Sequence, residues 1–174
     1  MRIVYLFALV IFFGACKSQQ MDKNPENKNA SISSESCPEA GSCNIVLHKN
    51  STLTLMEDGT GAMYPNIGKG NGLVVEFTYS EKGPEGTADG NYSETIHFEI
   101  PEQATTLSLK NNGLTEVNML WGKHCYCKGE AGYFPVSNGS LKVEKLGNSL
   151  IFEVKINMKE REQKINHIKR TVTL

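Results

Sequence analysis

The sequence lacks the short motifs that mark the common catalytic and cofactor sites. It contains no G-x-S-x-G, H-E-x-x-H, P-loop or dinucleotide-binding fingerprint. It also has no C-x-x-C redox pair and no C-x-x-C-H haem attachment site. These absences exclude the most familiar hydrolases, nucleotide-binding enzymes and thiol oxidoreductases, so we expect a non-catalytic protein without a cofactor. Catalytic residues scattered over several strands would leave no local motif, and an enzyme of unfamiliar type stays open on that ground.

An excess of charge of either sign is also lacking. The 18 Lys and Arg residues nearly balance the 19 Asp and Glu residues, and the net charge is −1. Without the first fifteen residues, which contain one Arg, the balance is 17 minus 19, or −2. A chain of this charge is not drawn as a whole to nucleic acid or to anionic lipid. We therefore expect no nucleic-acid partner, and any membrane contact would have to come from attached lipid.

Long apolar runs are absent except at the N-terminus. There, one cationic residue precedes the apolar run from Ile3 to Phe13, which ends on the small residues Gly14 and Ala15. This order is typical of a secretory signal, and the run is shorter than the roughly 20 apolar residues that a transmembrane helix needs. Because Cys16 follows at once, the stretch resembles the lipobox signal of bacterial lipoproteins, with Phe13 where that family usually has Leu.

The resemblance implies that residues 1–15 are a signal peptide and that Cys16 carries the acyl chains, such as palmitate, that anchor the protein in a Gram-negative envelope. Lys17 stands where Asp would retain such a lipoprotein in the inner membrane, so the outer membrane is implied and the leaflet is left open. The alternative is an ordinary signal peptide that leaves Cys16 as a free thiol. The polar stretch from Lys17 to Ser36 predicts a flexible tether before a domain at 37–174.

The domain shows a period of two residues. Leu73, Val75, Phe77 and Tyr79 would share one face of a strand, with more polar residues on the other face. The same alternation marks Tyr92 to Ile100, Leu141 to Glu144 and Leu150 to Met158. Seven to ten short strands without a periodic helix predict an all-β fold, either an antiparallel sandwich or a barrel. The glycine-rich segments at 57–72 and 81–91 and the charged segment at 159–164 are expected to be loops.

Four cysteines remain for the domain: Cys37, Cys43, Cys125 and Cys127. In an exported protein, disulfides are the default. If residues 125–127 are extended, the side chains of Cys125 and Cys127 are nearly parallel, which favours pairing of each with the first cysteine segment, although three pairings exist. The alternative is a zinc or copper site that adds His124 to these cysteines, with spacings unlike those of common zinc sites.

Four aromatic residues cluster around the second cysteine pair: Trp121, Tyr126, Tyr133 and Phe134. They could form a platform for a sugar or a peptide, whereas large aromatic side chains in a sandwich usually fill the core. We interpret the chain as a membrane-anchored, non-catalytic binding module for a protein, a peptide or a glycan. The alternatives are a metal-handling lipoprotein that uses the Cys and His set and an inhibitor of an envelope enzyme.

Overall fold

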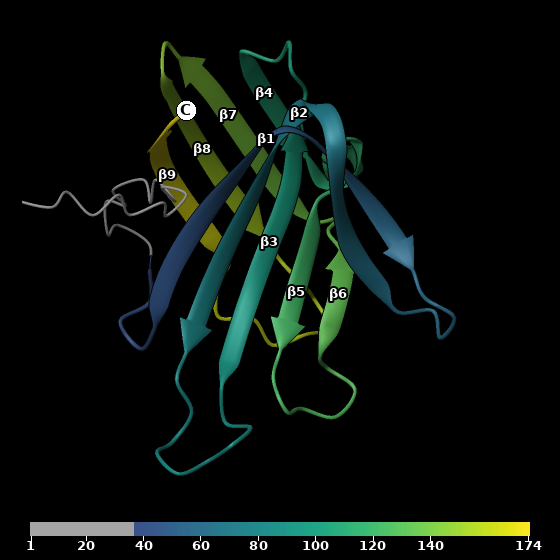
Figure 1. Cartoon of the computed structure of the whole chain (residues 1–174), viewed down its shortest axis with the longest axis vertical. Coiled ribbons are helices and arrows are strands. Elements are labelled where there is room, and N and C mark those ends of the chain that lie inside the picture. The colour runs from purple at the N-terminus through teal and green to yellow at the C-terminus, as the bar shows by residue number, and fades with distance from the viewer. Residues whose placement is uncertain (1–36) are drawn as a thin grey trace, which may run out of the picture.

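The computed structural model describes residues 37–174. The expected signal peptide, the expected lipid on Cys16 and the expected tether lie outside the described residues. The described chain forms two antiparallel sheets of five and four strands, which confirms the all-β prediction. Figure 1 shows the two sheets as the two layers of a sandwich.

The larger sheet has the strand order β1-β2-β3-β5-β6. Its strands are β1 (Ser42–Glu57), β2 (Met63–Glu81), β3 (Tyr92–Ile100), β5 (Leu120–His124) and β6 (Gly132–Pro135). The smaller sheet has the order β4-β7-β8-β9. Its strands are β4 (Thr106–Lys110), β7 (Gly139–Leu146), β8 (Ser149–Ile156) and β9 (His167–Thr173). The chain therefore passes twice between the sheets in its central part, after β3 and after β4, and returns to the smaller sheet after β6.

One short 3-10 helix, η1 (Asn111–Val117), connects β4 to β5. The sequence predicts no periodic helix, and η1 is too short to show a period. Its two buried residues, Leu114 and Val117, pack into the core, and Asn118 ends it in a left-handed conformation at φ 50°. A positive φ is tolerated by Asn more readily than by most residues.

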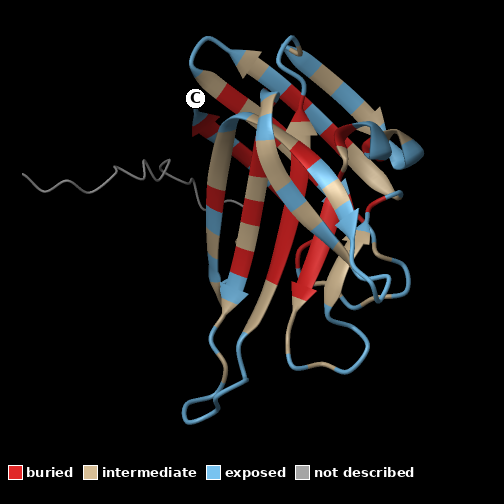
Figure 2. Ribbon diagram, turned by 45° about the vertical axis from the view of Figure 1, so that its right-hand side comes forward, coloured by how far each residue is buried: buried red, intermediate tan, exposed pale blue. Residues whose placement is uncertain are grey.

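The core lies between the two sheets. Val75, Phe77 and Phe98 point into it from β2 and β3, and Phe152 meets them from β8. The rings of Phe98 and Phe152 contact edge to face with centroids 5.6 Å apart, which joins the sheets at their centre. Figure 2 shows the resulting alternation of buried and more exposed residues along β8 and β9. The period-two prediction is confirmed for β8, but in β3 Thr95 and His97, on the face expected to be exposed, are buried.

The hairpin of β1 and β2 is longer than the sheet, and its distal half bends over the sheet face that lies away from the core (Figures 1 and 2). The bend begins at Asn50, which has φ 50°, where the register with β2 shifts. Glu99 of β3 holds the bent strand because its carboxylate accepts a hydrogen bond of 2.8 Å from the backbone amide of Leu53. At its far end, Met63 pairs with Tyr133 of β6.

This bend corrects one expectation. Most of the glycine-rich segment 57–72 is not a loop, because β2 begins at Met63 and pairs with β1 along its length. The glycines weaken intrinsic strand preference, but continuous pairing with β1 overrides a local preference of this size. The other two expected loops, at 81–91 and 159–164, do connect strands, namely β2 to β3 and β8 to β9.

The cysteines pair locally, as Cys37–Cys43 and Cys125–Cys127, with Cα atoms 5.9 Å and 5.2 Å apart. The prediction that each cysteine of the second pair bonds to the first cysteine segment is therefore wrong. Its premise fails because β5 ends at His124 and the chain bends at Cys125, so residues 125–127 are not an extended strand. Strands β2 and β3 also lie between the two cysteine segments.

Candidate ligand-binding basin

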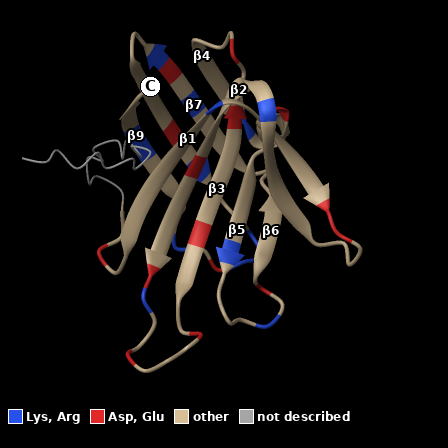
Figure 3. Cartoon of the chain, in the orientation of Figure 1, with Lys and Arg blue, Asp and Glu red and all other residues tan. Residues whose placement is uncertain are grey.

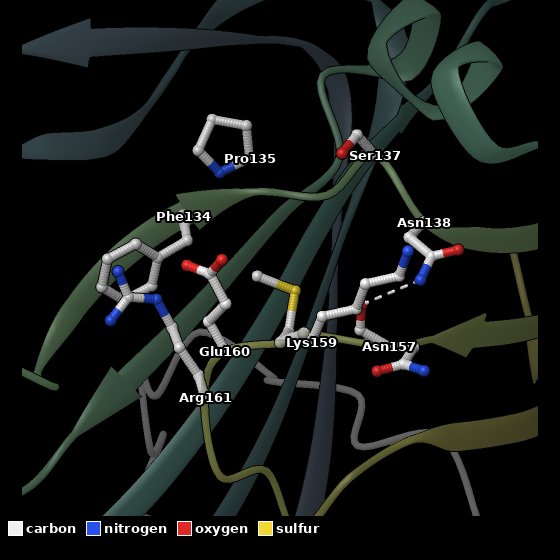
Figure 4. Close-up of a pocket in the computed structure, with 9 residues that line it drawn as sticks. Phe134, Pro135, Ser137, Asn138, Asn157, Lys159, Glu160 and Arg161 are labelled. Carbon is white, nitrogen blue, oxygen red and sulfur yellow. Dashed lines mark hydrogen bonds between the residues drawn. The ribbon is translucent and has the colours of Figure 1, made fainter.

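An open basin of about 480 Å³ lies where the chain leaves β6, facing the connection between β8 and β9 (Figure 4). Its volume is within the range of roughly 300 to 1,000 Å³ that is usual for small-molecule sites. One wall is formed by residues 134–138 and the other by residues 157–161. The lining residues are Phe134, Pro135, Ser137, Asn138, Asn157, Met158, Lys159, Glu160 and Arg161.

The second wall belongs to the charged connection at 157–166, whose backbone is held by side chains. Gln163 folds back under it, and its Oε1 accepts a hydrogen bond of 2.5 Å from the amide of Met158. Its Nε2 donates to the carbonyls of Ile156 and Ile165 at 3.2 Å and 2.9 Å. One half-buried side chain thus satisfies three backbone groups, which is how an irregular segment gains a single conformation.

Glu94 of β3 ties the same connection to the larger sheet. Its side chain is fully buried, and its carboxylate accepts hydrogen bonds from the amides of Lys164 at 2.5 Å and Ile165 at 3.0 Å. Trp121 Nε1 donates to it at 3.2 Å, and the Tyr92 hydroxyl donates as well. Burial, and then the bond to Glu94, raise the pKa of Tyr92. A buried carboxylate is tolerated only when donors surround it in this way.

Lys123 of β5 forms the second tie. It is 3% exposed, and its ammonium donates to the carbonyl of Glu162 at 3.1 Å and to the carboxylate of Glu130 at 2.5 Å. The hydrogen bond and the charge of Lys123 lower the pKa of Glu130. Figure 3 shows a basic segment in blue at the end of β5 and an acidic segment in red on the neighbouring strand β3. Two oppositely charged, buried groups thus hold one surface segment from neighbouring strands.

Arg161 is fixed on the aromatic side of the basin. Its guanidinium carbon lies 3.6 Å from the centroid of the Phe134 ring, and the two groups overlap in the view of Figure 4. The ring of Phe134 in turn lies against Trp121, with centroids 5.9 Å apart. Stacking leaves the edge of the guanidinium without a hydrogen bond or an ion pair of 4 Å or less within residues 37–174, and at longer range its charge helps to lower the pKa of Glu130. Such an edge offers parallel donors to a planar acceptor.

The four aromatic residues expected to bind do not form one platform. Trp121 is fully buried in the core, Phe134 lines the basin, and Tyr126 is 90% exposed on the loop between β5 and β6. Tyr133 points to the opposite face of the sheet, because neighbouring strand residues alternate. The structure thus brings Phe134 together with Lys159, Glu160 and Arg161 of the expected loop at 159–164.

Tyr133 faces the inside of the bent sheet, where it joins a cluster of histidines. Its ring centroid is 5.0 Å from that of His124 and 6.0 Å from that of His97. His97 is 3% exposed, and its Nε2 lies 3.9 Å from a carboxylate oxygen of Glu76. Burial lowers the pKa of His97, although the nearby charge of Glu76 opposes this effect.

No family model, no curated protein and no solved structure matches the chain.

The alternative metal set is not assembled in the structure. The four cysteine sulfurs are joined in two disulfides, and His124 lies 3.4 Å from the hydroxyl of Thr95. Across residues 37–174, no three His, Cys, Asp or Glu side chains are arranged to hold a metal ion.

The same residues, 37–174, include no helix with the length and apolar character that a membrane crossing requires.

Proposed function

We propose that the protein is an envelope lipoprotein, anchored through acylated Cys16, that binds a small polar ligand in the basin without catalysis. The observation that carries the binding part is the way the wall at 157–166 is held. Its backbone is bonded to buried Glu94 and Lys123, which lie on two strands of the other sheet.

This arrangement is more than a turn requires. An antiparallel hairpin can be closed by about two residues, and a solvated loop needs no buried charge to support it. Burying a carboxylate and an ammonium costs several kcal/mol each before their hydrogen bonds offset it. A wall fixed at that cost loses little conformational entropy when a ligand binds, so the ligand meets a pre-organised surface.

The binding part is tested by isothermal titration calorimetry on the purified full chain. The ligands are a panel of neutral oligosaccharides, acidic oligosaccharides and short peptides. Ser137 is exposed at the rim, so Ser137→Trp should fill the basin and abolish binding without disturbing the core. Thr171→Trp places the same side chain at an exposed position on β9 and is the matched control. Binding that survives Ser137→Trp would contradict a site in the basin.

The anchoring part is tested by fractionation of cells that express the protein. The wild type should enter the membrane fraction, and Cys16→Ser should release it to the soluble fraction. A single acyl chain binds membranes only marginally, so the proposal requires more than one chain on Cys16, which mass spectrometry of the purified protein would detect. Unchanged membrane association of Cys16→Ser would contradict it.

A second candidate function is docking to another envelope protein, including an enzyme to be inhibited. Tyr126 favours it, because this side chain is 90% exposed between two cysteines that are bonded to each other. Tyrosine on a constrained loop is typical of the anchors that dominate protein interfaces. A photo-crosslinking residue at 126 should capture one partner that the same residue at exposed position 171 does not.

A further inference from the structure

We infer that the ligand of the basin is a saccharide that carries a carboxylate, such as a uronic acid. The inference rests on the proposed function and adds the chemical class. It is drawn from three features of the lining: a pre-oriented arginine on one side, a row of neutral polar side chains with a lysine beside it on the other, and two apolar side chains.

The cationic side of the basin suits a carboxylate. Arg161 is held in place by Phe134, so its free edge can donate two parallel hydrogen bonds to the two oxygens of one carboxylate. Lys159 is exposed and extends to the other side of the basin, beside Asn138 (Figure 4), and no ion pair within residues 37–174 involves it. Charge-assisted hydrogen bonds are roughly twice as strong as neutral ones, so this side should dominate the choice of ligand.

The opposite side of the basin suits hydroxyl groups. Ser137, Asn138 and Asn157 present one hydroxyl and two amides, which both donate and accept hydrogen bonds (Figure 4). Asn138 is oriented by a hydrogen bond of 3.4 Å from its Nδ2 to the carbonyl of Asn157, which leaves its amide oxygen to accept from a ligand. Neighbouring hydroxyls on a sugar ring, each a donor and an acceptor, match such a row, whereas a simple inorganic anion offers acceptors only.

Two side chains of the lining supply the apolar contact that a sugar ring also needs. Pro135 and Met158 are apolar residues of the same lining. The C–H face of a pyranose is apolar, so it can lie against these side chains while its edge is hydrogen bonded. Methionine adapts its shape to such a surface because its side chain is unbranched.

Glu160 is the single acidic residue of the lining, and its replacement can distinguish an acidic ligand from a neutral one. Its carboxylate repels an anionic ligand but would accept a hydrogen bond from a neutral sugar. Replacing it by Gln should therefore strengthen the binding of an acidic sugar and leave a neutral sugar unchanged or weakened. If the basin instead selects neutral sugars, Glu160→Gln should weaken the binding of the neutral sugar and should not favour the acidic one.

The test compares trigalacturonate with its methyl ester, which has the same rings and hydroxyls but no charge. Both are titrated by calorimetry into the purified full chain. We expect the acid to bind about tenfold more tightly than the ester, the effect of one charge-assisted hydrogen bond of roughly 1.4 kcal/mol. Arg161→Gln and Lys159→Gln should each reduce this ratio, and Glu160→Gln should increase it. Lys82→Gln, an exposed lysine on the loop from β2 to β3, should leave the ratio unchanged.

The outcomes separate this inference from the proposed function. If Ser137→Trp abolishes the binding of both compounds and they bind equally well, the carboxylate is not recognised and only the inference falls. If the tripeptide Asp-Asp-Asp competes in the basin as well as trigalacturonate does, the saccharide part of the inference is overturned. If the trisaccharides and every member of the earlier panel are insensitive to Ser137→Trp, the proposed function falls as well.

Discussion

The carboxylate of Glu94 accepts a hydrogen bond of 3.0 Å from the backbone amide of Ile165, which lies 71 positions later in the sequence. The bond joins a strand of one sheet to the segment that precedes the last strand of the other sheet. Because Glu94 also binds the amide of Lys164, a buried charge takes the place of the ladder hydrogen bonds that this segment lacks. The shape of the basin therefore depends on a residue that does not line it.

Glu94→Gln should destabilise the protein by about 2 to 4 kcal/mol. The substitution removes a buried charge from a site made of donors and turns an NH₂ group toward at least one of them. Urea unfolding measures the change. Glu116→Gln, at an exposed position of η1, should stay within about 0.5 kcal/mol of the wild type. Equal stability of the two variants would contradict a structural role for the Glu94 carboxylate.

Lys123→Met should raise the pKa of Glu130 toward its ordinary value. Lys123 lowers that pKa by a hydrogen bond and by its charge, and Met keeps the apolar stem of the side chain without the charge. A lowered folded-state pKa gives stability that is present above the unfolded-state pKa and is lost as the pH falls through the folded-state value. The variant should therefore lose less stability on acidification than the wild type does.

Carboxyl ¹³C NMR titration of Glu130 measures this shift directly. The pKa of Glu153 is lowered by hydrogen bonds from Lys155 and His167, and it should stay lowered in Lys123→Met. A Glu130 carboxyl that titrates identically in both proteins would refute the ion pair.

His97 should titrate below the ordinary histidine pKa of 6.5, because burial disfavours its charged form. In the pH range between 6.5 and the lowered value, the unfolded chain binds the proton and the folded chain does not. Stability from this group is therefore complete above 6.5 and decreases as the pH falls below it. The charge of Glu76 opposes the shift, and those of His48 and His124 add to it, so Glu76→Gln should lower the pKa of His97 further. Imidazole ¹H–¹³C NMR would contradict this if His97 titrated at or above 6.5.

Tryptic digestion without reduction should release each disulfide inside a single peptide. Cleavage after Lys123 and Lys128 leaves Cys125 and Cys127 together, and no tryptic site separates Cys37 from Cys43. Mass spectrometry should find each peptide lighter by two hydrogen atoms than its reduced form. A crosslinked species that joins the two peptides would show that the cysteines pair over a long range.

Part of the fold could be predicted from the sequence because β7, β8 and β9 are half-buried, whereas β3 and β5 are buried on both faces. Along β8, Leu150, Phe152 and Val154 face the core and the residues between them are more exposed. The sequence therefore shows the period of two that predicts a strand. The distal half of the hairpin could not be predicted in this way. Its pairing with β6 joins Met63 to Tyr133, a contact that no local pattern encodes.

The basin was beyond sequence reasoning for a related reason. Phe134 was among the expected binding residues, but Arg161 belongs to a short charged run that reads as an ordinary solvated loop. What makes it a candidate site residue is its stacking on Phe134 and the bonding of its neighbours to Glu94 and Lys123. The only sequence signal was a pair of charged residues, Glu94 and Lys123, on the faces of β3 and β5 that are otherwise apolar.

The pairing of Met63 with Tyr133 has a consequence for self-association. A strand at the border of a sheet offers unpaired amides and carbonyls on which a second molecule can add a strand, the first step of many aggregates. At Tyr133, β6 has β5 on one side and the start of β2 on the other, so this point of its border is closed to such templating. A protein crowded onto a two-dimensional surface by an anchor would gain from this protection.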